Sequence, residues 1–541
     1  MLTLVPHPTR AAPAGPVVCV VMDGIGVGKR DAGDAVALAH TPNLERLRKL
    51  ASYRELQAHG RSVGMPSDAD MGNSEVGHNA LGAGRIFDQG ATLVANAIAT
   101  GAMFDAAPWR ELVATTLANH GTLHLLGLVS DGNVHSHIDH LIALVRRAAT
   151  ESIARVRVHA LLDGRDVPPR SALGYLEHLE GVLAGVRAGG CDARIASGGG
   201  RMRITMDRYG ADWPMVAHGW EIHVRGEGRR FPSARVAVET MYAELGIDDQ
   251  NLPGFVVDEG QGPCGPIVDG DTVVLFNFRG DRALEISKAF DQVEFTGFDR
   301  RVRPRVTFYG MMQYDGDELV PTRFLVAPPV IDRTMGELLA ASGKRQLAIS
   351  ETQKYGHVTY FWNGNRSGKF DDLLEDYIEV PSDTRPFEER PWMQAAEITD
   401  AVIAALDRKH YDFVRLNYAN GDMVGHTGVL ESTRLAVEAV DLCLGRIFAA
   451  VHRHAGIVVV TADHGNADQM IDVDSRGNAL PRTSHSLNPV PFAIFDWRSP
   501  GDAPAVVRDG TRNLGYVAAT CLELMGLQAP DDYLPSLLAP R

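Results

Sequence analysis

The side chains best suited to chemistry are carboxylates and imidazoles that recur in distant parts of the chain. Asp422 and His426 are four residues apart, a spacing that places both on one face of a helix or in one tight turn. Asp463 and His464 directly follow an apolar run. Carboxylates and imidazoles without thiolates suit Mn²⁺, Zn²⁺ or a similar divalent ion. The candidate ligands of this kind are Asp23, Asp422, His426, Asp463, His464 and His485.

Each of these residues also has an ordinary structural explanation. An Asp that follows a strand is commonly a turn former, and a single His is commonly a hydrogen-bonded core residue. The metal hypothesis depends on these residues taken together, because residues able to bind a metal recur after apolar runs in two distant parts of the chain.

Ser74 is the candidate nucleophile, in the segment MGNSEVGHNALGAGR (71–85). The ordinary interpretation is a helix N-cap, a role open to Asn73 or Ser74. The functional interpretation is a hydroxyl at a helix N-terminus, where free N–H groups and the helix dipole favour an incoming phosphate. A serine hydroxyl is a poor nucleophile near neutral pH, and coordination to a divalent ion would lower its pKa.

Arginines beside aspartates and glycines occupy the middle of the chain. Guanidinium groups match the geometry of phosphate and carboxylate, although surface ion pairs are the ordinary alternative. Asp166 is a candidate general acid and base. His135, His137 and His140 fit a separate zinc site, a substrate-binding histidine or a polar turn, and their spacing does not decide among these. The candidate arginines are Arg165, Arg201, Arg208, Arg279 and Arg282.

Apolar runs that end in polar residues predict the strands that position these side chains. Amphipathic helices are predicted between them, at 140–149 and 435–451. Alternating strands and helices indicate the α/β class. Connectors are expected near 82–90 and 320–330, and residues 1–16 are expected to form a loose leader. The predicted strands lie within 17–22, 155–166, 271–282 and 456–465.

Composition excludes several classes of protein. The chain has 541 residues and a formal net charge of −15, which argues against a general binder of nucleic acid or of anionic membranes. Its five cysteines are scattered and form no CxxC pair, so neither a disulfide framework nor a thiolate zinc site is indicated. The sequence has no apolar run long enough to cross a membrane. We therefore expect a soluble, cytoplasmic protein.

Ten sequence motifs, which include most of the candidate residues above, occur in the same order as in the cofactor-independent phosphoglycerate mutases, and the chain resembles this family of the alkaline-phosphatase superfamily. The resemblance covers nearly the whole chain, and the Ser74, DMVGHTG and ADHGN segments together are highly specific. The seven-residue spacing of Arg201 and Arg208 is similar to the longer plant-like and trypanosomatid-like form. The matching motifs are VVMDGIG (20–26), MGNSEVGHNALGAGR (71–85), SDGNVHSHIDH (130–140), LDGRDVPP (162–169), MDR (206–208), FNFRGDR (276–282), ETQKYGHVTYF (351–361), NYANGDMVGHTG (417–428), TADHGNAD (461–468) and SHSLNPVPF (484–492).

The resemblance implies an architecture and a set of roles. An alkaline-phosphatase-like, metal-binding domain would comprise residues 1–87 and 328–541, with a second α/β domain, residues 88–327, inserted into it to bind substrate and close over the site. One ion would be held by Asp422, His426 and His485, and a second by Asp23, Ser74, Asp463 and His464. The substrate would be bound by His135, Arg165, Asp166, Arg201, Arg208, Arg279, Arg282 and Lys354.

The implied activity is the interconversion of 3-phosphoglycerate and 2-phosphoglycerate, a glycolytic isomerisation. It would proceed through a phosphoserine on Ser74 without bisphosphoglycerate, with Asp166 moving the proton. Two divalent ions are expected, with Mn²⁺ as the first candidate and Mg²⁺, Co²⁺ or Zn²⁺ as alternatives. The family resemblance also implies a monomer. The alternatives are a metal-dependent phosphatase, another phosphomutase of the superfamily, or a metal-binding or phosphometabolite-binding protein without turnover.

Overall fold

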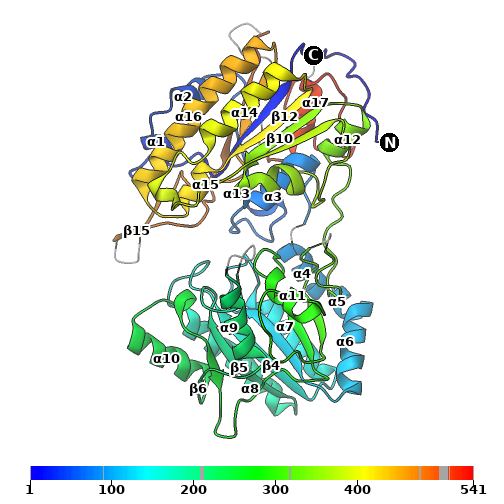
Figure 1. The fold of residues 1–541 in the computed structure, drawn as a ribbon, viewed down its shortest axis with the longest axis vertical. Coiled ribbons are helices and arrows are strands. Elements are labelled where there is room, and N and C mark those ends of the chain that lie inside the picture. The colour runs from blue at the N-terminus through cyan, green and yellow to red at the C-terminus, as the bar shows by residue number, and fades with distance from the viewer. Residues whose placement is uncertain are drawn as a thin grey trace. The chain divides into compact units, whose positions relative to one another are not determined.

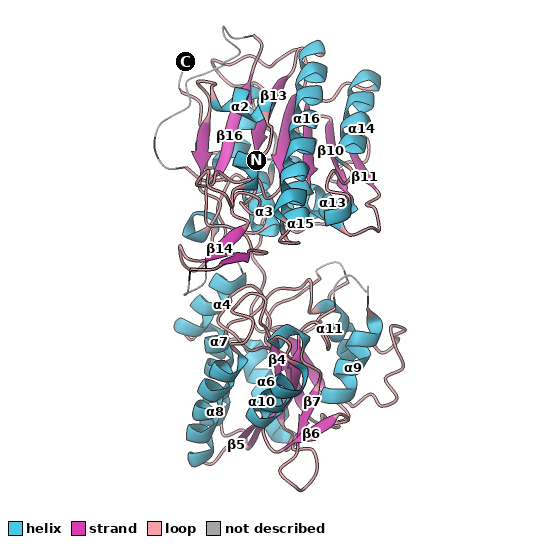
Figure 2. Ribbon diagram, turned by 90° about the vertical axis from the view of Figure 1, so that its left-hand side faces the viewer, coloured by secondary structure: helices cyan, strands magenta, loops and turns pink. Residues whose placement is uncertain are grey.

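The computed structural model describes residues 2–88, 90–207, 212–315, 318–473, 477–498, 510 and 512–539. The chain divides into two compact units, drawn in Figures 1 and 2. Unit 1 comprises Met1–Gln89 and Val330–Arg541, and unit 2 comprises Gly90–Pro329. Unit 2 is thus inserted into the sequence of unit 1. Among the described residues, no helix combines the length and apolar character needed to cross a membrane.

Unit 1 is built on a seven-stranded sheet with the strand order β11-β10-β12-β1-β13-β16-β2. The five strands from β11 to β13 are parallel, whereas β16 is antiparallel to β13. Its strands are β1 (Val17–Met22), β2 (Arg54–Leu56), β10 (Gln346–Glu351), β11 (Glu375–Val380), β12 (Phe413–Tyr418), β13 (Ile457–Thr461) and β16 (Val490–Phe495), with a separate ribbon of β14 (Ile471–Val473) and β15 (Ala479–Pro481). Its helices are α1 (Ala35–Leu38), α2 (Pro42–Arg48), α3 (Ser74–Ala83), α12 (Met335–Ala341), α13 (Thr352–Gly356), α14 (Ala395–Arg408), α15 (Asn420–Gly425), α16 (Leu430–Arg453) and α17 (Tyr516–Leu524).

Unit 2 has a second seven-stranded sheet, with the order β6-β7-β5-β4-β3-β8-β9. Its neighbouring strands are parallel except for the β5–β7 pair. The strands are β3 (Leu123–Leu128), β4 (Arg155–Leu162), β5 (Asp192–Gly200), β6 (Arg229–Phe231), β7 (Phe255–Val257), β8 (Thr272–Leu275) and β9 (Thr307–Gly310). The helices are α4 (Gly90–Ala99), α5 (Ala102–Asp105), α6 (Ala107–Ala118), α7 (Ile138–Thr150), α8 (Ala172–Ala188), α9 (Trp213–His223), α10 (Ala234–Leu245) and α11 (Leu284–Asp291).

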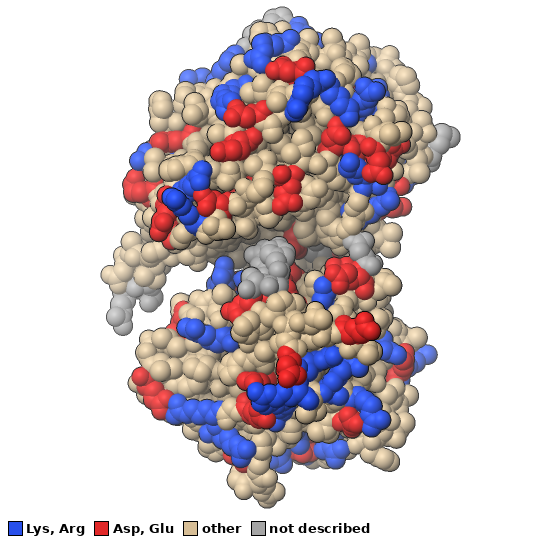
Figure 3. Space-filling model, viewed as in Figure 1, with Lys and Arg blue, Asp and Glu red and all other residues tan. Residues whose placement is uncertain are grey.

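Each sheet is buried by the helices that cover it. Strand β1 is entirely apolar and fully buried, as expected for a strand inside a parallel sheet. In β3, Leu123 and Leu125 join one apolar cluster, whereas Leu126 and Leu128 join another. This alternation is the period of two of a strand, so both faces of the unit 2 sheet are packed. On the face shown in Figure 3, basic and acidic side chains are interspersed on each unit.

The α/β class and the positions of the predicted strands agree with the structure, but two expectations need correction. The segment expected to be a loose leader is tied down by backbone pairing: His7 N donates to Gly526 O and Gln528 N donates to Val5 O. The first connector is also shorter than expected, because Gly82 belongs to α3 and Gly90 already begins α4. The leader pairs with residues more than 500 positions away in sequence, a partner that no local pattern reveals.

Candidate active site

Side chains with catalytic potential in unit 1 converge at the carboxyl ends of four neighbouring parallel strands, β10, β12, β1 and β13. Asp23 directly follows β1, and Asp463 follows β13 after one residue. Asp422 lies in α15, directly after β12, and Lys354 lies in α13, directly after β10. Parallel strands end at one edge, which is where open α/β sheets place their ligand sites. Sheet topology therefore gathers residues that are up to 440 positions apart.

Asp422, His426 and His485 form the first ligand group. The Nε2 atoms of His426 and His485 both lie 3.1 Å from Asp422 Oδ1 and 3.1 Å from each other. His426 Nδ1 donates to Thr483 O at 2.6 Å, and His485 Nδ1 donates to Gly72 O at 2.7 Å. A carbonyl oxygen only accepts, so each imidazole carries a proton on Nδ1 and turns its Nε2 atom toward the carboxylate.

This arrangement passes a chemical test for a metal site. Two imidazole Nε2 atoms that converge on one carboxylate oxygen are a donor set suited to a divalent cation. Metal-binding histidines usually donate their other ring N–H to a backbone carbonyl or a carboxylate, as both imidazoles do here. Burial and the neighbouring His464 lower the pKa of His485 to about 4, so this imidazole is neutral near pH 7, the form that binds metals.

Asp23, Asp463 and His464 form the second ligand group, with Ser74 beside it. Ser74 Oγ lies 2.9 Å from His464 Nε2 and 3.2 Å from Asp23 Oδ1. Asn73 is the N-cap of α3, because its side chain accepts from Val76 N, and Ser74 is the first helical residue. The capping role considered for Ser74 is therefore filled by its neighbour. The Ser74 hydroxyl is left among ligand-type groups at a helix N-terminus.

Lys354 lies among the acidic groups of both ligand sets. Its Nζ is 2.9 Å from Asp23 Oδ1, 2.7 Å from Asp422 Oδ2 and 2.5 Å from Ser74 Oγ. Burial lowers the pKa of Lys354, but the nearby carboxylates outweigh burial and raise it. Burial likewise lowers the pKa of His464, and Asp463 together with Asp23 raises it to about 9. The cluster is thus an acidic site that attracts cations strongly.

Two buried polar residues that the sequence did not single out orient these groups. His78 Nδ1 lies 2.8 Å from Ser74 O and 3.3 Å from Asp463 Oδ2. Asn417 Nδ2 donates to Asp23 Oδ2 at 2.7 Å and lies 3.1 Å from His78 Nε2. His78 is four residues after Ser74 on α3, so helical spacing was a signal for it. Asn417 lies near the carboxyl end of β12, and only the tertiary structure reveals its role.

Close backbone approach explains two glycines of this site. Gly24 has a φ of +73°, and a Cβ there would lie 2.5 Å from Asp422 N. At Gly77, in the first turn of α3, a Cβ would lie 2.7 Å from Asp463 Cβ. Any larger side chain would push Asp422 or Asp463 away from its present position.

In unit 2, a second cluster forms around the buried guanidinium of Arg201. Arg201 is 1% exposed, and its Nη1 donates to Asp163 Oδ1 at 2.8 Å and to the carboxylate of Asp166. Asp163 also accepts from the backbone N–H groups of Arg165 and Asp166, at 3.2 and 3.1 Å. This places the backbone of Arg165 and the candidate acid–base Asp166 beside Arg201. Asp163 was not singled out from the sequence, although it belongs to the same LDGRD segment.

His135 and Arg279 meet at a second carboxylate, Asp281. Arg279 Nε lies 3.0 Å and His135 Nδ1 lies 3.6 Å from Asp281 Oδ1. Burial first, and Arg201 second, lower the pKa of His135 well below its ordinary value, so it is neutral. Arg282 Nη1 donates to Met206 O at 2.9 Å. Arg208, the remaining predicted arginine, lies outside the described residues.

The neighbouring histidines have structural surroundings. His137 is the N-cap of α7, where its side chain accepts from Asp139 N. His140 is buried, and burial lowers its pKa to about 4. Of the three histidines in this motif, His135 is the one beside the arginine cluster, with Arg201, Arg279 and Arg282 all acting on its pKa.

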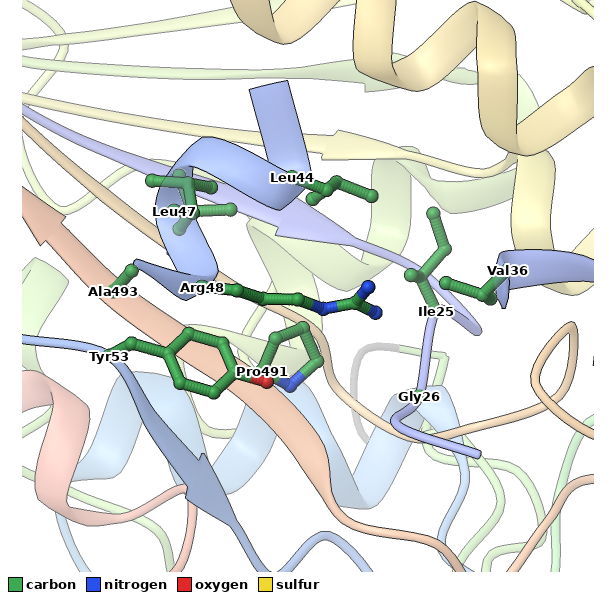
Figure 4. A pocket seen from close by; sticks show the side chains of 10 residues that line it. Ile25, Gly26, Val36, Leu44, Leu47, Arg48, Tyr53, Pro491 and Ala493 are labelled. Atoms are coloured by element: carbon green, nitrogen blue, oxygen red, sulfur yellow. The ribbon is translucent and has the colours of Figure 1, made fainter. Parts of the chain in front are cut away.

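An enclosed pocket in unit 1, shown in Figure 4, does not serve as a substrate site. Its cavity volume is about 10 Å³, room for roughly one water molecule. The side chain of Arg48 extends across it between Tyr53 and Ile25.

The sequence is similar to curated proteins along nearly its whole length. The profile of the Metalloenzyme superfamily matches residues 15–529. A protein of Leptospira interrogans named "Probable 2,3-bisphosphoglycerate-independent phosphoglycerate mutase" is 52% identical over 537 residues, covering 96% of this chain and 97% of its own length. The 2,3-bisphosphoglycerate-independent phosphoglycerate mutase of Trypanosoma brucei brucei is 49% identical over 551 residues, covering 99% of both chains.

The fold is similar to that of a solved relative. The Leishmania mexicana phosphoglycerate mutase, crystallised at low cobalt concentration, superimposes with a TM-score of 0.90 at 48% identity, and the match covers 100% of both chains. This confirms the expected α/β fold class, with a second α/β domain inserted into the sequence of the first. The chain therefore belongs to the Metalloenzyme superfamily and, within it, to the 2,3-bisphosphoglycerate-independent phosphoglycerate mutases, which are isomerases.

Proposed function

We propose that this protein interconverts 3-phosphoglycerate and 2-phosphoglycerate through a phosphoserine on Ser74, with two divalent ions and without bisphosphoglycerate. The main support is the position of Ser74 Oγ, 2.9 Å from His464 Nε2 and 2.5 Å from Lys354 Nζ at a helix N-terminus. Family membership supports the reaction class.

The proposal divides the roles between the two units. Asp422, His426 and His485 would hold one ion, and Asp23, Asp463 and His464 would hold the other together with Ser74. When bound, these ions lower the pKa of the Ser74 hydroxyl and stabilise negative charge on the phosphoryl oxygens. Mn²⁺ is our first candidate, and Mg²⁺, Co²⁺ and Zn²⁺ are the alternatives; Co²⁺ is the ion named for the Leishmania structure.

Unit 2 would bind the phosphoglycerate anion. Its guanidinium groups offer paired N–H donors to phosphate and carboxylate, and the neutral His135 offers one further donor or acceptor. The proposed substrate-binding residues are His135, Arg165, Asp166, Arg201, Arg208, Arg279 and Arg282 of unit 2 and Lys354 of unit 1. The proposal requires both sets of side chains to act on the same phosphoglycerate molecule.

Before the first chemical step, the Ser74 hydroxyl gives up its proton to solvent. Ser74 Oγ then attacks phosphorus in line, and the bond between phosphorus and the C3 oxygen breaks. Asp166 gives its proton to the departing C3 oxygen, so that glycerate and phosphoserine result. In the second step, Asp166 takes the proton of the 2-hydroxyl, the C2 oxygen attacks phosphorus, and the bond from Ser74 Oγ to phosphorus breaks. The product is 2-phosphoglycerate, and Ser74 and Asp166 return to their starting states.

Phosphorus NMR of 3-phosphoglycerate with the purified protein tests the proposal. Bisphosphoglycerate is omitted, and EDTA-treated protein is compared with protein given Mn²⁺, Mg²⁺, Co²⁺ or Zn²⁺. We expect 2-phosphoglycerate to appear only when an ion is restored. Release of inorganic phosphate would instead identify a phosphatase, and no reaction of the folded protein with any ion would overturn the proposal. The proposal extends to a cytoplasmic monomer, which cell fractionation and sedimentation test.

A further inference from the structure

A chain of buried polar side chains crosses the unit 2 sheet, away from the residues given roles above. It begins at Asp271, before β8, and ends at Thr205, after β5. None of its members is more than 3% exposed. Its successive separations are 3.1 Å (Asp271 Oδ2 to His124 Nε2), 2.9 Å (His124 Nδ1 to His159 Nε2), 2.7 Å (His159 Nδ1 to Ser197 Oγ), 2.8 Å (Ser197 Oγ to His223 Nδ1) and 3.0 Å (His223 Nε2 to Thr205 Oγ1).

One assignment of protons satisfies every link of this chain. His124 donates from Nε2 to Asp271, and His159 donates from Nε2 to His124. The Ser197 hydroxyl donates to His159 Nδ1 and accepts from His223 Nδ1. His223 Nε2 accepts from the Thr205 hydroxyl. All donors then point toward the Asp271 carboxylate, with the three imidazoles neutral. Burial is the main cause that lowers the pKa of each of these histidines, which agrees with the neutral assignment.

The end of the chain at Thr205 is an unusual backbone position. Thr205 has a φ of +70°, a conformation that is rare and strained for a β-branched residue. Gly219 of α9 permits close contact, since a Cβ there would lie 2.1 Å from Thr205 Oγ1. The hydroxyl bond to His223 and the bond from Thr205 N to Met215 O, 3.1 Å, hold the residue in this conformation.

The next residue connects Thr205 to the arginine cluster. Met206 O accepts from Arg282 Nη1 at 2.9 Å. On the other side, the turn from Arg201 to Thr205 is closed by the bonds from Arg203 N and Ile204 N to Gly200 O. The Arg201 backbone is also held by the bonds from Arg201 N to Leu162 O and from Met202 N to Gln250 O. A change in the direction of the backbone at Thr205 therefore moves Met206 O, and with it the partner of Arg282.

We propose that this chain is a positioning network that fixes Arg282 for the phosphoglycerate anion, an inference that rests on the proposed function. A buried imidazole that lacks a hydrogen-bond partner raises the free energy of the folded protein, so three imidazoles are tolerated in a sheet core only while each is fully hydrogen-bonded. Removal of the Thr205 hydroxyl leaves His223 Nε2 without a donor and releases the strained turn toward an ordinary conformation.

The central test replaces the hydroxyl while keeping the shape of the side chain. Thr205→Val is expected to raise KM for 3-phosphoglycerate about tenfold, with kcat changed less than about threefold, because one hydrogen bond that fixes the binding groups is lost. Thr205→Ser, which keeps the hydroxyl, should stay near wild type. The matched control is Thr116→Val, which removes another buried hydroxyl of unit 2, bonded to Leu112 O and Thr272 Oγ1; it should lower Tm but leave KM unchanged.

A KM in Thr205→Val equal to that in Thr116→Val would overturn the inference, since the network would then contribute only stability. A second measurement does not depend on this variant folding or on turnover. In wild-type protein labelled with ¹⁵N-histidine, His223 should show the neutral Nδ1–H tautomer and His124 and His159 the neutral Nε2–H tautomer, with Ser197→Ala and His223→Gln used for assignment. Any other pattern would overturn the directional chain.

These readouts separate failure of the inference from failure of the proposed function. If wild-type protein shows no mutase activity, the proposed function fails. The variants are then compared by their dissociation constants for inorganic phosphate. A weaker affinity in Thr205→Val alone would support the network as an anion-positioning device, and equal affinities would overturn it.

Discussion

The two units place their polar side chains by the same sheet topology, but the cluster in unit 1 is suited to cations and the cluster in unit 2 to anions. In each, polar residues follow parallel strands of an α/β sheet, at the edge where such sheets bind ligands. In unit 1, the carboxylates of Asp23 and Asp422 lie beside Lys354 and belong to the two candidate ligand groups, a site for cations. In unit 2, guanidinium groups lie beside Asp163 and Asp281, and we propose this cluster as a site for anions. Under the proposed function, one architecture serves metal binding in one unit and anion binding in the other.

Ser74→Ala should have the largest effect, because it removes the proposed nucleophile from the unit 1 site. We expect turnover to fall by about 10⁴-fold or more with little change in folding, since Asn73 supplies the helix cap. Mass spectrometry of acid-quenched wild-type protein should find phosphate on the Ser74 peptide, and the variant should lack it. The control is Ser432→Ala, at a half-buried serine bonded to Glu388 O, and it should keep full turnover.

His485→Ala tests whether the cation preference of unit 1 reflects a real metal site. It removes one of two imidazole Nε2 atoms that converge on Asp422 Oδ1, so we expect the loss of about one bound ion and a fall in turnover of about 100-fold or more. Elemental analysis of dialysed protein measures the ions. His454→Ala, at a half-exposed histidine paired with Asp407, should keep both the ions and the rate. Unchanged metal content in His485→Ala would contradict the assignment.

Arg279→Ala tests the anion preference of unit 2. Loss of a charged donor beside Asp281 and His135 should raise KM for 3-phosphoglycerate roughly 10- to 100-fold. Initial-rate kinetics over a range of substrate concentrations separate KM from kcat. Arg305→Ala, which removes an exposed arginine paired with Asp269, is the control. Kinetics of Arg279→Ala that match this control would move the anion site elsewhere.

The smallest expected effect is a pH dependence of stability in unit 2. Burial lowers the pKa of His124, His159 and His223, the last to about 3. A lowered pKa means that the unfolded chain binds more protons below its own pKa of about 6.5, so stability is complete above that pH and falls as the pH decreases. Each imidazole should cost about 1.4 kcal/mol per pH unit in that window.

Hydrogen exchange of the intact protein measures this effect locally. Peptides from β3, β4 and β5 should lose protection between pH 7.5 and pH 5.5 after correction for the intrinsic exchange rate. Protection that is equal at both pH values would show that the folded protein binds as many protons as the unfolded chain, and so that folding does not lower the pKa values of these imidazoles.

Local sequence patterns predicted the strands well, but they did not predict which distant segments of the chain contact one another. The apolar run 17–22 is strand β1 as predicted, because a buried parallel strand has a composition that is visible in six residues. The leader could not be interpreted in this way, since its order comes from backbone bonds to Gly526 and Gln528. His78 and Asp163 lay inside segments that had already been singled out, yet their roles depend on the atoms they contact.

The sequence by itself determined the residue types and the class of chemistry. Carboxylates, imidazoles and a serine at strand and helix ends indicate a metal site with a candidate nucleophile, and the order of the motifs specifies the family. Only the tertiary structure decided which side chains meet, that the Nε2 atoms of His426 and His485 converge on one carboxylate oxygen, and that a buried chain of imidazoles ends at Thr205. The physical reason is that hydrogen bonds and coordination act over about 3 Å in space, whereas these residues are separated by tens to hundreds of positions along the chain.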